Sequence, residues 1–257
     1  MMQNLLENRT FLVAGAGGLL GTRLVAAILE QGAKVIAADI NLESMATRLS
    51  SLGVDPTNEK LSLVSLDVTN ESSVKSFFST DLKIDGAVNT TYPRNKTYGS
   101  HFFDVTLESF NENLSLHLGS MFLFTQQCAK YFTQCQTPFS LVNISSIYGV
   151  VAPKFDIYNN TKMTMPVEYA AIKSATLHLN KYTVAYVNDS RFRINCVSPG
   201  GIFDHQPEPF LEAYKSHTHG AGMLDVTEII GSVLFLLSEQ SRYVTGQNII
   251  VDDGFSL

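Results

Sequence analysis

The sequence has no apolar run approaching the roughly 20 residues that a helix needs to cross a bilayer. Basic residues are also in the minority, 18 against 24 acidic ones, for a net charge of −6. We therefore expect no membrane insertion and no broad basic surface for nucleic acid. The 3 cysteines form no CxxC pair, which favours buried thiols in a reducing, cytoplasmic setting.

What the sequence does contain is apolar material for one large core, since 45% of its 257 residues are hydrophobic and 16% are charged. Short apolar segments alternate with segments of helical periodicity. Strands are predicted at residues 10–14, 34–39, 61–66, 84–88, 139–144, 192–197 and 248–251. Helices are predicted from residue 19 and over 107–134, 167–188 and 225–237. This alternation indicates an α/β protein with a doubly wound parallel sheet, a Rossmann fold, and we expect residues 1–257 to form a single domain.

Long polar stretches interrupt the alternation at residues 150–166 and 201–222. Each follows a predicted strand, as does the shorter polar segment 90–100. Ligands of doubly wound sheets bind beyond the carboxyl ends of the strands. We therefore expect 150–166 and 201–222 to be substrate loops.

Glycines cluster between the first strand and the first helix, in a G-x-x-G-x-x-G pattern formed by Gly15, Gly18 and Gly21. Leu20 departs from the commoner G-x-G-x-x-G spacing. Glycine permits positive φ and lets the backbone approach a pyrophosphate at a helix N-terminus. We expect these four residues to line a dinucleotide, although a tight turn without a ligand would have the same composition.

Asp39 ends the second predicted strand, 24 residues after Gly15 (39 − 15). A carboxylate at this position hydrogen-bonds the ribose hydroxyls of a dinucleotide and repels a 2′-phosphate. The next residue is Ile40 and not a basic residue, so we predict NAD(H) in preference to NADP(H), with both residues beside it. The alternative is that Asp39 caps a helix starting at Asn41.

Tyrosine and lysine recur at a spacing of four residues, which would place both side chains on one helix face. Three pairs have this spacing: Tyr92/Lys96, Tyr158/Lys162 and Tyr169/Lys173. Only the last lies in a convincing helix. A neighbouring ammonium and a cationic nicotinamide would lower the pKa of the Tyr169 phenol, so that it exchanges a proton with a carbonyl or alcohol. We predict that Lys173 assists and that Ser146 holds the substrate oxygen; otherwise Tyr169 is a surface helical residue.

Further short motifs accompany these residues: Asp67-Val68, Asn89, Asn143-Ile144-Ser145-Ser146, Asn195-Cys196-Val197-Ser198-Pro199-Gly200, Gly246-Gln247 and Val251-Asp252. With them the chain resembles the short-chain dehydrogenase/reductase family over essentially its whole length. The family's usual spacing fits Tyr169, 30 residues before Pro199 (199 − 169), and does not fit Tyr158, 41 residues before it (199 − 158).

The resemblance implies a homo-oligomer, a tetramer, that binds NAD(H) and a small-molecule substrate. It also implies cofactor contacts for residues in and near these motifs: Asp67 and Val68 at the adenine, Asn89, Tyr169 and Lys173 at the ribose, and Pro199, Gly200 and Ile202 at the nicotinamide. His117 stands where the family usually has an active-site asparagine. An imidazole there can relay a proton through water or can simply be a packed helical histidine.

We predict that the substrate contacts Arg94 and Lys96, which follow Asn89, and His205 in the second loop. Two cations at a pocket mouth favour an anionic substrate, although they equally fit a solvated loop. We expect no metal site. The segments 92–96, 102–106, 163–169 and 246–257 resemble a narrower group, the oxidoreductases of flagellin modification protein A type. That resemblance implies an amino-sugar or sugar-phosphate in nonulosonic acid synthesis. Alternatives are a 3-oxoacyl-thioester reductase and a non-catalytic dinucleotide sensor or scaffold.

Overall fold

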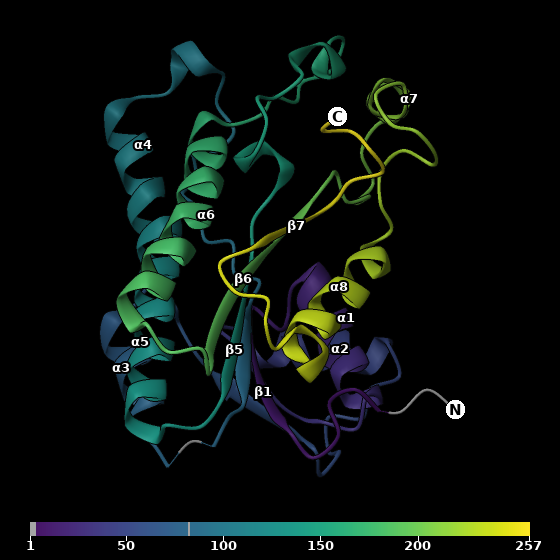
Figure 1. The fold of residues 1–257 in the computed structure, drawn as a ribbon. Helices are drawn as coiled ribbons and strands as arrows, with labels where there is room; N and C mark the ends of the chain where they lie inside the picture. The colour runs from purple at the N-terminus through teal and green to yellow at the C-terminus, as the bar shows by residue number, and fades with distance from the viewer. Residues whose placement is uncertain (1–3, 82) are drawn as a thin grey trace.

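Seven parallel strands form the centre of the molecule, in a computed structural model that describes residues 4–81 and 83–257 (Figure 1). The strands are β1 (Thr10–Ala14), β2 (Lys34–Asp39), β3 (Leu61–Ser65), β4 (Gly86–Asn89), β5 (Phe139–Ile144), β6 (Phe192–Pro199) and β7 (Asn248–Val251). Their order in the sheet is β3-β2-β1-β4-β5-β6-β7. The chain runs from β1 to one edge, returns to the middle at β4 and continues to the other edge. This topology confirms the doubly wound parallel sheet.

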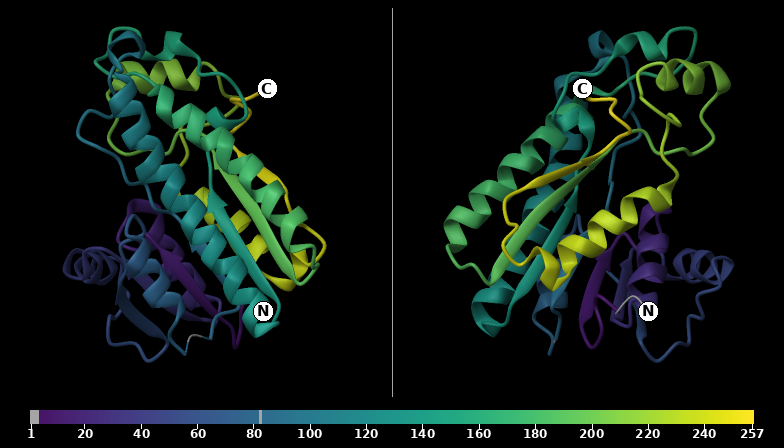
Figure 2. Two further views of the ribbon diagram at one scale, coloured as in Figure 1. Left: turned by 90° about the vertical axis from the view of Figure 1, so that its left-hand side faces the viewer. Right: turned by 45° about the vertical axis from the view of Figure 1, so that its right-hand side comes forward.

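Helices cover both faces of the sheet (Figures 1 and 2). One face carries α3 (Glu71–Phe78), α5 (Ser120–Cys135) and α6 (Val167–Val187), and the other carries α1 (Leu19–Glu30), α2 (Leu42–Ser51) and α8 (Ile230–Leu237). Phe11 and Val13 of β1 pack into the core beneath α1 and α8, whereas Leu12 and Ala14 pack into the core beneath α3 and α5. Consecutive strand residues are thus buried on opposite faces, which explains why the strand sequences are continuously apolar.

A third apolar cluster involves α7 (Glu208–Lys215), which lies at the top of Figure 1. It combines Tyr158 from the first predicted substrate loop, Phe210 and Tyr214 from the second, and Phe255 near the C-terminus. The rings of Tyr214 and Phe255 stack with centroids 4.4 Å apart. Both predicted loops are therefore anchored to each other and to the final segment of the chain.

Two expected elements differ from the structure. The helix expected over 107–134 consists of α4 (Leu107–Asn113), a π-helical segment (Leu114–Gly119) and α5. A π-helical turn contains an extra residue, and apolar periodicity does not reveal it. The stretch 201–222, expected to be a loop, contains α7. Smaller differences are a strand at Gly86–Asn89 instead of 84–88 and a 3-10 turn before α8.

Candidate active site

The turn between β1 and α1 requires glycine at two positions. Gly15 has φ +80°, and a Cβ there would lie 2.7 Å from Thr90 Oγ1, while a Cβ on Gly21 would lie 2.1 Å from the Gly15 carbonyl oxygen. Gly18 is the N-cap of α1 and provides no side-chain cap. The first N–H groups of α1 are therefore open to an anion, a geometry that fits a pyrophosphate. Leu20, also predicted at this turn, packs into the core.

The Asp39 carboxylate lies beside this turn. Its Oδ2 accepts a hydrogen bond from the Gly17 N–H at 2.9 Å, and its Oδ1 accepts one from the Asn41 N–H at 3.2 Å. Asn41 itself caps α2, because its side chain accepts from the Ser44 N–H at 2.9 Å. The capping role that competed with a cofactor contact for Asp39 thus belongs to Asn41.

Arg48 of α2 is a second polar residue beside this turn, and no sequence pattern predicted it there. Its Nη1 donates to the Gly17 carbonyl oxygen at 3.0 Å, so Arg48 and Asp39 contact the same glycine. Ile40, next to Asp39, is 69% exposed. A basic residue therefore lies near Asp39, the carboxylate that we predicted to bind the ribose. It is Arg48 of the following helix, α2, and no sequence motif identifies it.

Ser146, Tyr169 and Lys173 meet between the end of β5 and the first turns of α6. The Ser146 hydroxyl lies beside the Tyr169 phenol and by itself lowers the pKa of that phenol. Lys173 Nζ donates to the Ile144 carbonyl oxygen at 2.9 Å and lies 5.4 Å from the centre of the Tyr169 ring. Ser145 Oγ donates to the Lys173 carbonyl oxygen at 2.9 Å, which ties the strand end to the helix. The structure brings the three predicted residues together, and their catalytic roles stay predictions.

The π-helical segment directs His117 to the same place. His117 Nε2 lies 3.5 Å from Lys173 Nζ, and the residue is 1% exposed. Its ring also packs edge-on against Tyr92, with centroids 5.0 Å apart. The imidazole is therefore both a packed group and a neighbour of Lys173, and its role as a proton relay stays a prediction.

Burial governs the protonation of these groups. It lowers the pKa of Lys173 to about 8, because a buried ammonium loses hydration. Burial and the charge of Lys173 together lower the pKa of His117 to about 2, so the imidazole is neutral at pH 7. Burial also raises the pKa of Tyr169, and the Ser146 hydroxyl offsets only part of this effect. We had expected a lowered phenol pKa, but in the chain itself desolvation wins.

Tyr92, from a pair that we set aside because proline follows it, contacts these residues. Its ring centre lies 5.7 Å from that of Tyr169 and 5.7 Å from Lys173 Nζ. Its hydroxyl is hydrogen-bonded to that of Tyr98. The Arg94 guanidinium lies 5.0 Å from the Tyr92 ring centre and 5.9 Å from that of Tyr98. Tyr92 thus separates the predicted anion-binding arginine from Tyr169. Its place just after β4, at the carboxyl edge, was the signal that could have identified it.

The predicted cofactor residues on the neighbouring strand ends have structural partners of their own. Asn89 is fully buried, and its Oδ1 accepts from the Thr91 N–H at 3.1 Å and the Thr91 hydroxyl at 2.7 Å. Asp67 makes a similar turn by accepting from the Thr69 N–H at 2.9 Å, and Val68 packs into the core. All three lie where strands end at the carboxyl edge of the sheet, and their cofactor contacts stay predictions.

The residues after β6 bring backbone close to the same edge. The Gly200 N–H donates to the Val251 carbonyl oxygen at 2.8 Å, and a Cβ on Gly200 would lie 2.8 Å from the Tyr214 hydroxyl. Pro199 ends β6, and Ile202 forms an isolated bridge with Leu224. A glycine is therefore needed directly after the strand.

Lys96 and His205 lie apart from this group. Both are exposed, and no described hydrogen bond, ion pair or ring contact joins either one to Ser146, Tyr169 or Lys173. His205 instead packs against Phe203, with ring centres 5.6 Å apart. Among the contacts of the described residues, Arg94 is the predicted substrate residue that is linked to Tyr169, through the Tyr92 ring.

Within residues 4–81 and 83–257, no three residues of the types His, Cys, Asp and Glu are grouped so as to hold a metal ion. None of the helices in that part of the chain combines the length and the apolar character that crossing a membrane requires. His217 of the second loop pairs with Asp156 of the first at 2.8 Å.

Known proteins similar to this chain agree with the geometry. A family model described as enoyl-(acyl carrier protein) reductase matches residues 15–256. The post-translational flagellin modification protein A of Campylobacter coli is 39% identical, over 98% of this chain and 100% of that protein. A 7alpha-hydroxysteroid dehydrogenase of Bacteroides fragilis is 26% identical, over 99% and 96%. A short chain dehydrogenase from Leptospira borgpetersenii, solved with bound NAD+, superimposes with a TM-score of 0.87 at 30% identity, over 100% of this chain and 96% of that one.

Proposed function

Because the chain belongs to the short-chain dehydrogenase/reductase family, we propose that it transfers hydride between NAD(H) and a sugar-type ketone or alcohol. The substrate is an anionic amino-sugar or sugar-phosphate intermediate of nonulosonic acid and flagellin glycan synthesis. The observation that carries the proposal is the meeting of Ser146, Tyr169 and Lys173 at the end of β5. The relation to the flagellin modification protein of Campylobacter coli supports the sugar substrate.

The residues around the β1–α1 turn fit NAD(H). Gly15, Gly18 and Gly21 leave backbone N–H groups accessible at the start of α1, where a pyrophosphate would bind. The Asp39 carboxylate, held by the Gly17 N–H, would accept hydrogen bonds from the ribose hydroxyls. The NAD+ bound in the Leptospira borgpetersenii relative supports the same choice of cofactor.

When bound, the cofactor would supply or accept the hydride. The side chains of the protein donate and accept the proton. In the reducing direction the Tyr169 hydroxyl donates its proton to the substrate oxygen, which Ser146 holds by a hydrogen bond. The Lys173 ammonium, 5.4 Å from the ring centre, stabilises the phenolate that remains. His117 is neutral, so its Nε2 accepts from Lys173 Nζ and can pass a proton on through water. In the oxidising direction the proton moves the opposite way.

Arg94 is the proposed anion contact. No ion pair engages it within the described residues, and its guanidinium faces the Tyr92 and Tyr98 rings. A planar guanidinium can donate two parallel hydrogen bonds to a phosphate or carboxylate. Since the Tyr92 ring also contacts Tyr169, an anion bound by Arg94 would lie one ring away from the reacting oxygen.

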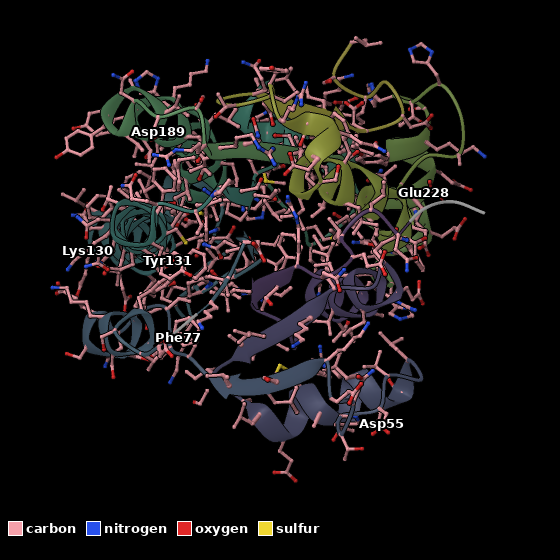
Figure 3. All side chains as sticks on the ribbon, turned by 60° about the horizontal axis from the view of Figure 1, so that its bottom comes forward. Asp55, Phe77, Lys130, Tyr131, Asp189 and Glu228 are labelled. Atoms are coloured by element: carbon pink, nitrogen blue, oxygen red, sulfur yellow. The ribbon has the colours of Figure 1, made fainter. Side chains whose placement is uncertain are left out.

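The test follows NADH oxidation with phosphorylated, nucleotide-linked and neutral keto-sugars. We expect turnover of the anionic sugars, and a fall of about tenfold in kcat/KM in Arg94→Ala, because one charge-assisted contact is lost. Lys130→Ala is the matched control, because this cation is exposed on the C-terminal half of α5, at the end of the molecule that Figure 3 brings forward. NADH binding without turnover of any substrate would instead support a sensor or scaffold.

A second candidate function is reduction of a 3-oxoacyl thioester. The observation that favours it is an apolar groove of about 310 Å³ at the start of α6, with a lining suited to an acyl chain: Phe102, Val105, Thr106, Leu107, Phe110 and Val167. Turnover of thioesters but not of sugars, lowered by Phe110→Ser and unaffected by Arg94→Ala, would select this function.

A further inference from the structure

Asn113, the last residue of α4, connects two segments that are distant in sequence. It is 1% exposed, and its Oδ1 accepts from the Asn95 N–H at 3.0 Å. Its Nδ2 lies 3.1 Å from Asn95 Oδ1, 3.1 Å from the Ser109 carbonyl oxygen and 3.2 Å from Glu168 Oε1. One amide thus contacts the polar segment after β4 and the first turn of α6.

Glu168 immediately precedes Tyr169 and is 0% exposed. Its Oε1 is hydrogen-bonded to Asn113, and its Oε2 has no hydrogen-bond partner among residues 4–81 and 83–257. A buried carboxylate held by a single hydrogen bond depends strongly on that bond, because losing it would leave the whole group unsatisfied. The first turn of α6 is therefore tied to Asn113 at the residue next to the predicted proton donor.

Asn95 immediately follows Arg94, in a segment without regular secondary structure. Besides its two bonds with Asn113, its Nδ2 donates to Glu112 Oε2 at 2.7 Å. Side-chain hydrogen bonds to α4, and not a strand or helix, thus fix the backbone that carries Arg94.

We propose that Asn113 and Glu168 form a positioning bridge that holds Arg94 at a set distance from Tyr169. This bridge makes the enzyme select anionic over neutral substrates. The inference rests on the proposed function, since Arg94 is the anion contact there. Bidentate contacts have a narrow geometry, and a displacement of about 1 Å is enough to weaken catalysis strongly. Neither bridge residue needs to touch the substrate.

The test uses Asn113→Asp, which keeps the shape and replaces the donating amide by a second carboxylate facing Glu168 Oε1. We expect kcat/KM for the phosphorylated sugar to fall about tenfold, mainly through KM, because the loss of one such bond changes an equilibrium by about that factor. KM for the neutral sugar and Kd for NADH stay within about twofold of the native values. In Arg94→Ala the same substitution has no further effect on anion preference.

Two matched variants complete the design. Asn111→Asp makes the same change at an exposed position of α4 and leaves all constants unchanged. Adding Glu168→Gln to Asn113→Asp restores a donor opposite the new carboxylate, and the preference for the anionic sugar returns. If Asn113→Asp does not fold, Asn113→Ala removes the bridge without adding a charge.

Hydrogen exchange over residues 92–98 supplies a readout independent of the substrate. Exchange of this segment should accelerate about tenfold in Asn113→Asp and return to normal in the double variant. Unchanged exchange overturns the proposal. Faster exchange with an intact preference for anionic sugars also overturns it, because the bridge would then be only structural. If no sugar is turned over by the native protein, the proposed function fails, and exchange alone decides whether the bridge holds the segment.

Discussion

Buried cations are paired differently at the two ends of the parallel strands, the amino-terminal edge where the strands begin and the carboxyl edge where they end. At the amino-terminal edge, Arg193 of β6 is 7% exposed and donates to three backbone carbonyls in and after the last turn of α8. At the carboxyl edge, Lys173 is 4% exposed and has one carbonyl partner, that of Ile144, besides the His117 imidazole. Burial lowers the pKa of both cations, but an arginine remains charged, whereas the pKa of Lys173 falls to about 8.

The surroundings repeat this contrast. At the amino-terminal edge, Arg191 pairs with Asp189 at 2.6 Å, and Arg9 pairs with Glu239. Figure 3 views the molecule from this end and labels Asp189. At the carboxyl edge, one oxygen of the buried Glu168 has no hydrogen-bond partner in the part of the chain that the structure describes. Complete hydrogen bonding and ion pairing hold the helix ends and strand starts in place. Buried groups with few partners can instead change protonation or bind a ligand. Perturbed and under-paired buried groups therefore indicate the functional edge.

The sharpest test of the carboxyl edge is Tyr169→Phe. Losing the proton-donating hydroxyl should lower kcat about 10³-fold, within the usual range for an acid–base group, and leave NADH binding intact. The measurement is steady-state NADH oxidation together with calorimetric binding. Tyr92→Phe is the control, since it keeps the ring against Tyr169 and should lower kcat less than about tenfold. A Tyr169→Phe enzyme with native kcat would refute the assigned role.

The amino-terminal edge should respond in stability and not in catalysis. Arg193→Met leaves buried carbonyls at the end of α8 without donors and should reduce the free energy of unfolding by about 3 kcal/mol. Denaturant unfolding measures this, and kcat of the folded variant should be native. Arg191→Met, at an exposed ion pair of the same edge, should have a smaller effect. Equal effects of the two substitutions would contradict the distinction between buried and exposed cations.

Asp39→Ser should reverse the cofactor preference. The substitution removes the carboxylate that would repel a 2′-phosphate, while Arg48 remains beside Gly17. We expect the ratio of kcat/KM for NADPH over NADH to rise about 100-fold, as measured with one fixed substrate. Adding Arg48→Ala should remove most of that gain. If NADPH use is unaffected by Arg48→Ala, the arginine does not reach the phosphate.

The pH dependence of stability should isolate His117. Its pKa is about 2 in the folded protein, against an ordinary value of 6.5, so below about pH 6.5 the unfolded state binds one more proton. Folded-state stability therefore falls as the pH is lowered, and the contribution at pH 5 is a loss of about 2 kcal/mol. His117→Asn should flatten the stability curve by that amount between pH 7 and pH 5. Parallel curves for the two proteins would show that folding does not lower the pKa of His117.

Local sequence patterns were enough for the parts of the site that lie within one element or one turn. The spacing of Tyr169 and Lys173 predicted a shared helix face, and the structure has both in α6. Gly15 and Gly21 were recognisable because their turn is contiguous, and the structure leaves no space for a Cβ at either position.

Contacts between distant segments were not predictable in the same way. Asn113 and Glu168 are 55 residues apart and look like an ordinary helix residue and an ordinary first-turn acid. Tyr92 was set aside because the proline after it is unfavourable in a helix. Its position just after the end of β4, which places it beside Tyr169, was not considered. The π-helical turn also escaped notice, since an extra residue changes the hydrogen bonds without breaking the apolar pattern.

The π-helical segment also makes the length of this helix subject to selection. Deleting a single codon within Leu114–Gly119 would remove the extra residue and restore α-helical geometry, with α4 and α5 keeping their relative rotation. Asn113 would still face Glu168, but the bulge that directs His117 toward Lys173 would be lost. The same deletion near Cys135, at the exposed end of α5, would only shorten the helix. Frame-preserving insertions and deletions in this gene should therefore be tolerated at one end of the helix and eliminated at the other.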